Sequence, residues 1–279
     1  MPFSEELVLS QRSLQDFIDC RRRFKLRFLD RLSWPAAIST PIDKYEYLSE
    51  LGTRFHHLVH QHHNGLDASS LLSTLRDPRL QRWFENYLKF FSPGEKFHAQ
   101  SEISLFTTLN HIRLVAKFDL VYSLSDETIH IVDWKTSQKP PDENWLAQRV
   151  QSILYPFVLA EAGKDLFPVL PPSPEKITLT YWFPENPQRP ALFPYSEELH
   201  AKHADKLTAI LESIQSAIRG DFGWDKTEQL DRCRFCIYRS HCDRGSQSGD
   251  LDQYQGLFDE DPETDLDSID LGQIGEIRY

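Results

Sequence analysis

Two stretches of the chain, Ala116-Lys117-Phe118-Asp119-Leu120-Val121 and Ile131-Val132-Asp133-Trp134-Lys135-Thr136, decide the fold. Each places one acidic residue among branched and aromatic apolar residues, a composition that is typical of a half-buried β-strand. The short polar link Ser125–Glu127 between them predicts a hairpin. Such a hairpin brings the two acidic residues together, and the alternation of side chains places Lys135 on the same face as the second of them.

Asp119, Asp133 and Lys135 form a candidate catalytic site. Two carboxylates at the rim of an apolar sheet repel each other unless a cation joins them, and oxygen ligands of this kind suit Mg²⁺ or Mn²⁺. The carbonyl of Trp134 is a further candidate ligand, and the Lys135 ammonium can position water or stabilise charge on a phosphate. An exposed hairpin with an Asp–Lys salt bridge is the alternative, but the apolar surroundings and the second Asp favour catalysis.

The rest of the chain shows helical and strand patterns. The first helix is expected to begin near Ser10 or Ser13. Further helices are expected over 45–63, 71–91 (with a break near Asp77-Pro78), 144–161 and 196–219. The first of these helices is expected to carry Cys20 in its apolar stripe. Strands are expected over 100–106, 112–124, 128–136 and 176–183, and the first three form an antiparallel meander.

The composition is that of a globular protein, since 40% of the 279 residues are hydrophobic and 26% are charged. We expect one domain over residues 1–245 and an acidic, disordered tail over 246–279. No apolar run approaches the ~18 residues that a membrane helix needs. Met1–Ser10 lacks the basic flank and apolar stretch of a secretory signal, so we expect a cytoplasmic protein without membrane contact.

The net charge of −11 is concentrated at the carboxyl end of the chain. Residues 246–279 hold ten acidic residues and one arginine, hence 1 − 10 = −9, which leaves −2 for the body. We interpret the tail as a solubilising linker, with mimicry of nucleic acid or recruitment of a basic partner as alternatives. A nearly neutral body can still carry a basic face for DNA. The candidates, for which a solvated helix face is the alternative, are Arg21, Arg22, Arg23, Lys25, Arg27 and Arg31.

The motifs and their order resemble the RecB-like family of PD-(D/E)xK nucleases, in which Asp119, Asp133 and Lys135 match the acidic residues and the lysine of the signature. The resemblance covers about Leu9 to Cys242 and departs at Ala116, where many members have Gly. It implies an α/β fold with a mixed sheet flanked by helices. It also implies a Mg²⁺- or Mn²⁺-dependent hydrolase that cleaves DNA, most simply an exonuclease, in repair, recombination or related DNA processing. A helicase or another repair protein in trans is the implied partner.

The resemblance adds candidate metal ligands from two other segments. Gly52-Thr53-Arg54-Phe55-His56 resembles the family's G-x-x-x-H helix, which makes His56 an extra ligand through a neutral imidazole nitrogen. His60, one turn later, is the rival candidate. Glu102 matches an acidic position of many relatives, although a solvent-facing residue near a strand end is the simpler interpretation.

A second helical motif, Gln151-Ser152-Ile153-Leu154-Tyr155, matches the family's Q-x-x-x-Y pattern. Its spacing puts Gln151 and Tyr155 on one helix face. In the family these residues orient the site or contact DNA. An amphipathic helix with a satisfied Gln and a core Tyr is the alternative.

The four cysteines form the last candidate site. Cys20 stands alone, whereas Cys233, Cys236 and Cys242 form a C-x2-C-x5-C group. In a cytosolic chain this suggests metal binding rather than disulfides. The arrangement resembles the iron–sulfur members of the family, such as the AddB helicase–nuclease subunit and the CRISPR-associated RecB-like exonuclease, which implies a [4Fe–4S] cluster. Structural Zn²⁺ is the nearest alternative, and free buried thiols are a more distant one.

Two other functions remain open. A catalytically inactive nucleic-acid-binding or scaffold protein could keep the same fold, and an RNA-processing nuclease could use the same site. The presence of every charged position of the signature favours an active enzyme over a scaffold. The cysteine site is expected to join the two ends of the domain and to have no electron-transfer role in catalysis.

Overall fold

The computed structural model describes residues 7–34, 42–91, 96–124, 127–137, 139–167 and 171–246. Nearly all of the expected acidic tail therefore lies outside the described residues. The helices are α1 Gln11–Asp19, α2 Arg21–Phe24, α3 Ile42–His63, α4 Ala68–Thr74, α5 Pro78–Phe90, α6 Glu143–Gln148, α7 Val150–Ala162 and α8 Glu197–Arg219. The strands are β1 Val8–Ser10, β2 Lys96–Leu109, β3 Ile112–Leu124, β4 Ile129–Trp134, β5 Ile177–Trp182 and β6 Ala191–Pro194.

The six strands form one mixed sheet in the order β1-β3-β4-β5-β6, and β2 pairs with β3 off this path. Strands β2, β3 and β4 are the antiparallel meander that the sequence predicts. The pairs β1–β3 and β4–β5 are parallel, and β5–β6 is antiparallel. The mixed α/β sheet flanked by helices is therefore confirmed.

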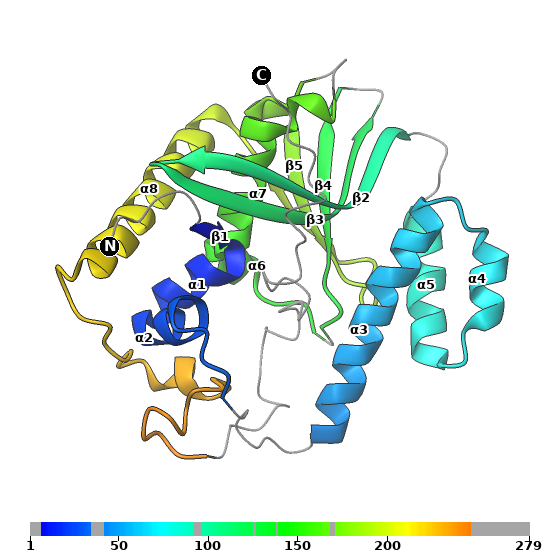
Figure 1. Cartoon of the computed structure of the whole chain (residues 1–279). Helices are drawn as coiled ribbons and strands as arrows, with labels where there is room; N and C mark the ends of the chain where they lie inside the picture. The colour runs from blue at the N-terminus through cyan, green and yellow to red at the C-terminus, as the bar shows by residue number, and fades with distance from the viewer. Residues whose placement is uncertain are drawn as a thin grey trace.

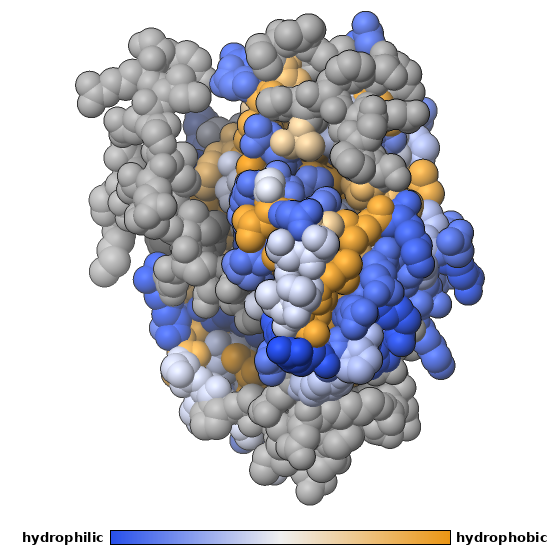
Figure 2. All heavy atoms as spheres, turned by 90° about the vertical axis from the view of Figure 1, so that its right-hand side faces the viewer, coloured by the Kyte–Doolittle hydropathy of each residue, from blue (hydrophilic) through white to orange (hydrophobic). Residues whose placement is uncertain are grey.

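Helices cover both faces of the sheet (Figure 1). Helix α7 packs on one face, in a core shared with α1 and α8. Helices α3 and α5 pack on the other face, in a core rich in aromatic rings such as Trp83, Tyr87 and Trp134. Seen from the side of α4 and α5, the surface is largely hydrophilic and is crossed by a hydrophobic band (Figure 2). The second core fixes the position of α3 relative to β3 and β4.

The first helix differs from its prediction at Cys20. Ser10 and Ser13 form a capping box that starts α1, but Cys20 is extended, with φ −165° and ψ 108°, and separates α1 from α2. A π-helix, Lys25–Leu29, follows directly. Cys20 therefore lies at a break between helices and not within one. Contacts with residues 222–242, which local periodicity cannot reveal, stabilise this bend.

The single helix expected over 144–161 is also divided in two. Arg149 is extended between α6 and α7, and Gln15 Oε1 accepts a hydrogen bond of 3.1 Å from Val150 N at the start of α7. Strands β1 and β6 have no counterpart in the prediction, because three or four residues are too few to show a period. The remaining expected elements are present with shifted ends.

Candidate active site

Glu102 on β2 and Asp119 on β3 lie opposite each other in the sheet. The pairs on either side of them are Ser101–Leu120 and Ile103–Phe118. Phe118 packs in the α7 core, whereas Leu120 packs in the α3/α5 core. Residues two apart on a regular strand share a face, so the alternation is broken here. Glu102 has a φ of +54°, a left-handed conformation that is costly for a residue with a β-carbon and that is found preferentially at functional sites.

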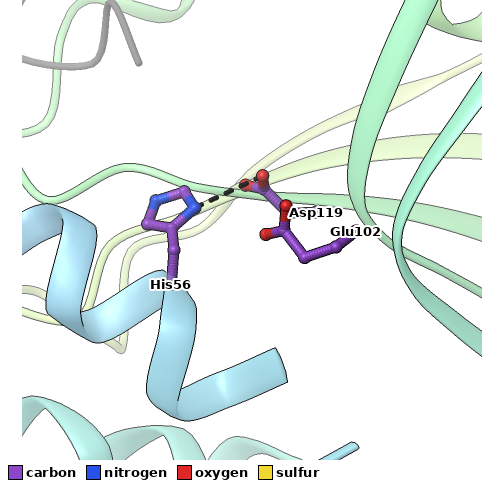
Figure 3. A group of neighbouring side chains, drawn as sticks. All are labelled: His56, Glu102 and Asp119. Atoms are coloured by element: carbon purple, nitrogen blue, oxygen red, sulfur yellow. Dashed lines mark ion pairs between the residues drawn. The ribbon is translucent and has the colours of Figure 1, made fainter. Parts of the chain in front are cut away.

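His56 from α3 completes a group with these two carboxylates. One potential ligand atom from each of His56, Glu102 and Asp119 lies within 4.8 Å of the other two (Figure 3). His56 Nδ1 is 3.3 Å from Asp119 Oδ1, and His56 Nε2 is 3.2 Å from the carbonyl oxygen of Trp134. Trp134 N donates a hydrogen bond of 2.8 Å to Asp119 Oδ2. The carbonyl of Trp134 thus adjoins the group.

The two carboxylates respond differently to their surroundings. Burial raises the pKa of Glu102, and the charge of Asp119 raises it further, against the opposing effects of Lys117 and His56. Burial also acts to raise the pKa of Asp119, but His56, the Trp134 N–H and Lys135 outweigh it and lower this pKa. Lys117 Nζ lies 3.0 Å from Glu102 Oε2. The site therefore holds adjacent, largely buried acidic groups that a cation would stabilise.

Asp133 and Lys135 form an adjoining buried pair. Lys135 Nζ is 2.7 Å from Asp133 Oδ2, and Gln151 Nε2 donates a hydrogen bond of 2.5 Å to Asp133 Oδ1. In the antiparallel register of β3 and β4, Leu120 pairs with Val132. The next position along both strands therefore brings Asp119 opposite Asp133. The two acidic residues therefore lie on adjacent strand positions, as predicted.

Tyr155 lies behind this pair and is buried, with 3% of its surface exposed. Burial raises the pKa of Tyr155 well above its ordinary value, and Asp133 and Asp119 raise it further, while a hydrogen bond with Gln151 opposes them. The phenol therefore stays protonated, and it contacts Gln151 and the ring of Phe118, 5.0 Å away. This placement suits a residue that orients Gln151 and leaves no surface for DNA.

The group of candidate metal ligands in the structure differs from the set predicted from the sequence. Asp133 is outside the group of three atoms within 4.8 Å, and its carboxylate is bound by Lys135 and Gln151. Glu102 is inside the group, and its interpretation as a solvent-facing strand-end residue is wrong, because β2 begins six residues earlier, at Lys96. The sequence signal for Glu102 as a candidate metal ligand was its match to an acidic position of many relatives. His60 instead contacts Ser101 Oγ at 2.8 Å.

The four cysteines line one pocket between α2 and the segment after α8. All four are free thiols of intermediate exposure. Within the described residues, no three cysteine Sγ atoms lie within 4.8 Å of one another. Tyr238 OH donates to the carbonyl of Leu32 over 2.9 Å, and Trp34 Nε1 donates to Ser240 Oγ over 2.8 Å. The two ends of the fold are thus joined, and the segment after α8 lies beside α2 at the lower left of Figure 1.

Basic residues surround the cysteines. Arg244 Nη1 donates to Cys233 Sγ over 2.8 Å. Burial raises the pKa of Cys236, and Arg23 and Arg27 act in the opposite direction. The further basic residues that line the pocket are Lys226, Arg232 and Arg239. Burial also raises the pKa of Cys242, so the basic lining only partly offsets the burial that keeps these two thiols protonated.

The basic run near residue 25 is largely occupied by intramolecular contacts. Arg23 and Arg27 both pair with Asp16 at 2.6 Å, and Lys25 Nζ lies 2.5 Å from Asp30. Arg21 lies over the ring of Phe222, 4.2 Å from its centroid. Arg21, Arg23 and Arg27 therefore pack around the bend at Cys20 and are not solvated side chains of a helix face, whereas Arg31 is exposed.

Comparison with known proteins identifies the class. The model of the PD-(D/E)XK nuclease superfamily matches residues 8–243, and the chain therefore belongs to this superfamily. No curated protein matches the chain. No helix in the part of the chain that the structure describes has the length and apolar character to span a membrane.

Two solved structures are similar in outline. The protein SSO0001 matches at 15% identity and a TM-score of 0.38, covering 86% of this chain and 87% of its own. A structure from Eubacterium rectale described as "Putative exonuclease" matches at 12% identity and a TM-score of 0.46, covering 81% of this chain and 87% of its own.

Proposed function

We propose that the protein is a RecB-like, divalent-metal-dependent deoxyribonuclease that acts as an exonuclease in DNA repair, recombination or related processing. The convergence of His56, Glu102 and Asp119 beside the Asp133–Lys135 pair carries this proposal. Membership of a nuclease superfamily supports it independently. We also propose a cytoplasmic location and a helicase or other repair protein as the partner in trans.

The residues present fit a divalent ion. Asp119, Glu102 and His56 would hold it, with the Trp134 carbonyl as a further ligand and Asp133 within reach from the adjacent strand position. This set of oxygen atoms and one imidazole suits Mg²⁺ or Mn²⁺. Such an ion stabilises negative charge on a phosphate and lowers the pKa of water. The raised pKa of Glu102, caused by burial and by the neighbouring Asp119, supports a site that requires a cation.

Side chains of the protein would supply the other functions that catalysis requires. Lys135, held by Asp133, directs an ammonium toward the place where a phosphate would meet the metal ligands, and it can orient water or donate to a phosphate oxygen. Gln151 fixes Asp133, and Tyr155 fixes Gln151. Because these supporting groups are buried, the geometry of Lys135 is set before substrate binds.

For the cysteines we propose a [4Fe–4S] cluster. Compact structural zinc sites usually take their ligands as two local pairs, whereas here one distant cysteine, Cys20, joins a group of three, Cys233, Cys236 and Cys242. The basic lining of the pocket suits the negative charge of a thiolate-ligated cluster. Structural Zn²⁺ is the alternative that metal analysis tests.

The experiment is a cleavage assay with Mg²⁺ or Mn²⁺ on linear and circular, single- and double-stranded DNA, with RNA of the same sequence beside them. We expect wild-type protein to degrade linear DNA and to spare circles. Lys135→Ala should abolish cleavage while DNA binding is retained. Degradation of RNA but not of DNA would favour the RNA-processing alternative.

A scaffold protein predicts a different outcome in the same assay. Wild-type protein that binds DNA but cleaves neither nucleic acid with either metal would favour it. The control variant is Lys176→Ala, because Lys176 also forms an ion pair with a carboxylate, that of Glu127, at 2.9 Å. It lies outside the site, so it should cleave as the wild type does.

A further inference from the structure

A pocket unrelated to the metal ligands lies between the end of α5 and the loop that joins β5 to β6. Its cavity volume is about 380 Å³, within the range of pockets that bind small ligands. The residues that line it are Asn86, Lys89, Phe90, Pro187, Gln188 and Pro190. This set combines an aromatic ring, two amides and one cation, and it contains no acidic residue.

Phe90 gives the pocket an aromatic platform. It is 40% exposed, although most large aromatic residues of this face are buried. Its ring is tilted against Trp182 at a centroid distance of 5.2 Å and meets the ring of Phe91 edge-on at 4.9 Å. A partly exposed ring held by two others is a preformed surface on which a flat heterocycle can stack.

One polar group beside the platform, Asn86, is held in place by a backbone carbonyl. Asn86 Nδ2 donates a hydrogen bond of 2.9 Å to the carbonyl of Pro184. Glu185 on the same loop pairs with Arg79 and Arg82, each at 3.1 Å, and accepts a hydrogen bond from Trp83. Glu185 is thus compensated by two arginines and does not repel an anion. Lys89 has no ion-pair partner among the described residues.

The pocket lies at the same edge of the sheet as the metal ligands. Phe90 contacts Trp182, and Trp182 contacts Trp134 at a centroid distance of 5.6 Å. Trp134 lies between Asp133 and Lys135 at the carboxyl end of β4, which runs parallel to β5. In open α/β sheets, ligands bind outside the carboxyl ends of the strands. The ring contacts pass through the core beneath this edge, and the pocket and the metal ligands both lie at the carboxyl ends of β4 and β5.

We propose that this pocket binds one unpaired nucleotide of the substrate strand, a short distance from the bond that is cleaved. The base stacks on Phe90, the amides of Asn86 and Gln188 contact its edge, and Lys89 contacts a phosphate. The inference rests on the proposed function for its substrate class. It assigns to α5 a task separate from catalysis: holding single-stranded nucleic acid.

Binding is tested without cleavage, with a fluorescently labelled oligothymidylate in EDTA and fluorescence anisotropy as the readout. Loss of one base–aromatic stack weakens binding by about tenfold or more, so Phe90→Ala should raise Kd by that factor. Phe90→Tyr keeps the ring and should bind within about twofold of wild type. Leu66→Ala, which removes another exposed apolar side chain, 46% exposed in the wild type, is the matched control and should leave Kd unchanged.

Two results would overturn the proposal: no oligothymidylate binding by wild-type protein, or equal Kd for wild type and Phe90→Ala. Weaker binding by Phe90→Ala in a protein that cleaves no nucleic acid supports the pocket and rejects the proposed function alone. If Phe90→Ala does not fold, photocrosslinking of wild-type protein with a 5-iododeoxyuridine oligonucleotide gives the answer. Attachment to the peptide that contains Phe90 is expected, and attachment only elsewhere would contradict the proposal.

Discussion

The backbone of Gly52 on α3 lies directly against the side chain of Thr136, just after β4. A β-carbon at Gly52 would stand 2.8 Å from Thr136 Oγ1, closer than a carbon and an oxygen can pack without movement. Gly52 is one turn before His56, and Thr136 follows Lys135. This close approach therefore sets the distance between the helix that carries the histidine and the strand that carries the lysine.

Gly52→Ala should separate α3 from β4. We expect a fall in kcat/KM of about tenfold to a hundredfold, because small displacements of catalytic groups have effects of this size. The free energy of unfolding should change by less than about 3 kcal/mol, since the strain is partly offset by the better helix propensity of Ala. Thr53→Ala, at the exposed neighbouring position, is the control for nuclease kinetics and thermal unfolding. Wild-type kinetics in Gly52→Ala would show that the contact does not position the site.

Glu102→Gln should weaken metal binding. The change removes one negative ligand while keeping the size of the side chain, so we expect the Kd for Mn²⁺ to rise by at least about tenfold, measured by isothermal titration calorimetry. Glu127→Gln is the matched control, because Glu127 also pairs with a lysine, at 2.9 Å, but on the surface. An unchanged Mn²⁺ affinity in Glu102→Gln would remove Glu102 from the ligand set.

Cys236→Ser should remove the proposed cluster. A metal site shared by the cysteines would connect residue 20 to residue 233, a loop of 233 − 20 = 213 residues, and loop closure on this scale stabilises a fold by as much as about 5 kcal/mol. We expect anaerobically purified wild type to contain iron, and Cys236→Ser to lose it and to unfold at lower temperature. Glu228→Gln, an exposed change in the same segment, should do neither. Zinc in place of iron would favour the structural zinc site.

His203 on α8 should make stability depend on pH. Burial lowers its pKa from 6.5 to about 4, helped by Lys206 and His200 and opposed by the backbone of Ile153. Above pH 6.5 the ring is neutral in both states, so it has no effect. Between pH 6.5 and 4 the unfolded chain binds the proton first, so the native state is destabilised as pH falls.

His203→Asn removes this titration. The free energy of unfolding of wild type should fall relative to that of the variant by less than about 1.4 kcal/mol per pH unit in this window, because the ring is partly exposed. Urea unfolding at pH 7.5, 6 and 5 measures the difference. Parallel pH dependence of the two proteins would contradict the assignment.

The sequence predicts the elements whose patterns are local and long. The meander, α3, α5 and α8, and the adjacency of Asp119, Asp133 and Lys135 all follow from periodicity and strand alternation. Glu102 could not be placed in this way. The prediction depends on side chains alternating between the two faces of a strand, and the left-handed backbone of Glu102 and the change of face at Asp119 break this alternation. The bend at Cys20 was missed for a related reason, since it depends on residues two hundred positions away.

We propose above all that His56, Glu102 and Asp119 hold one divalent ion next to Lys135. Anomalous X-ray diffraction from crystals soaked in Mn²⁺ tests it most directly. We expect a manganese peak within bonding distance of these three side chains, and its loss in Asp119→Asn. A peak elsewhere, or none in a protein that cleaves DNA with Mn²⁺, would contradict it.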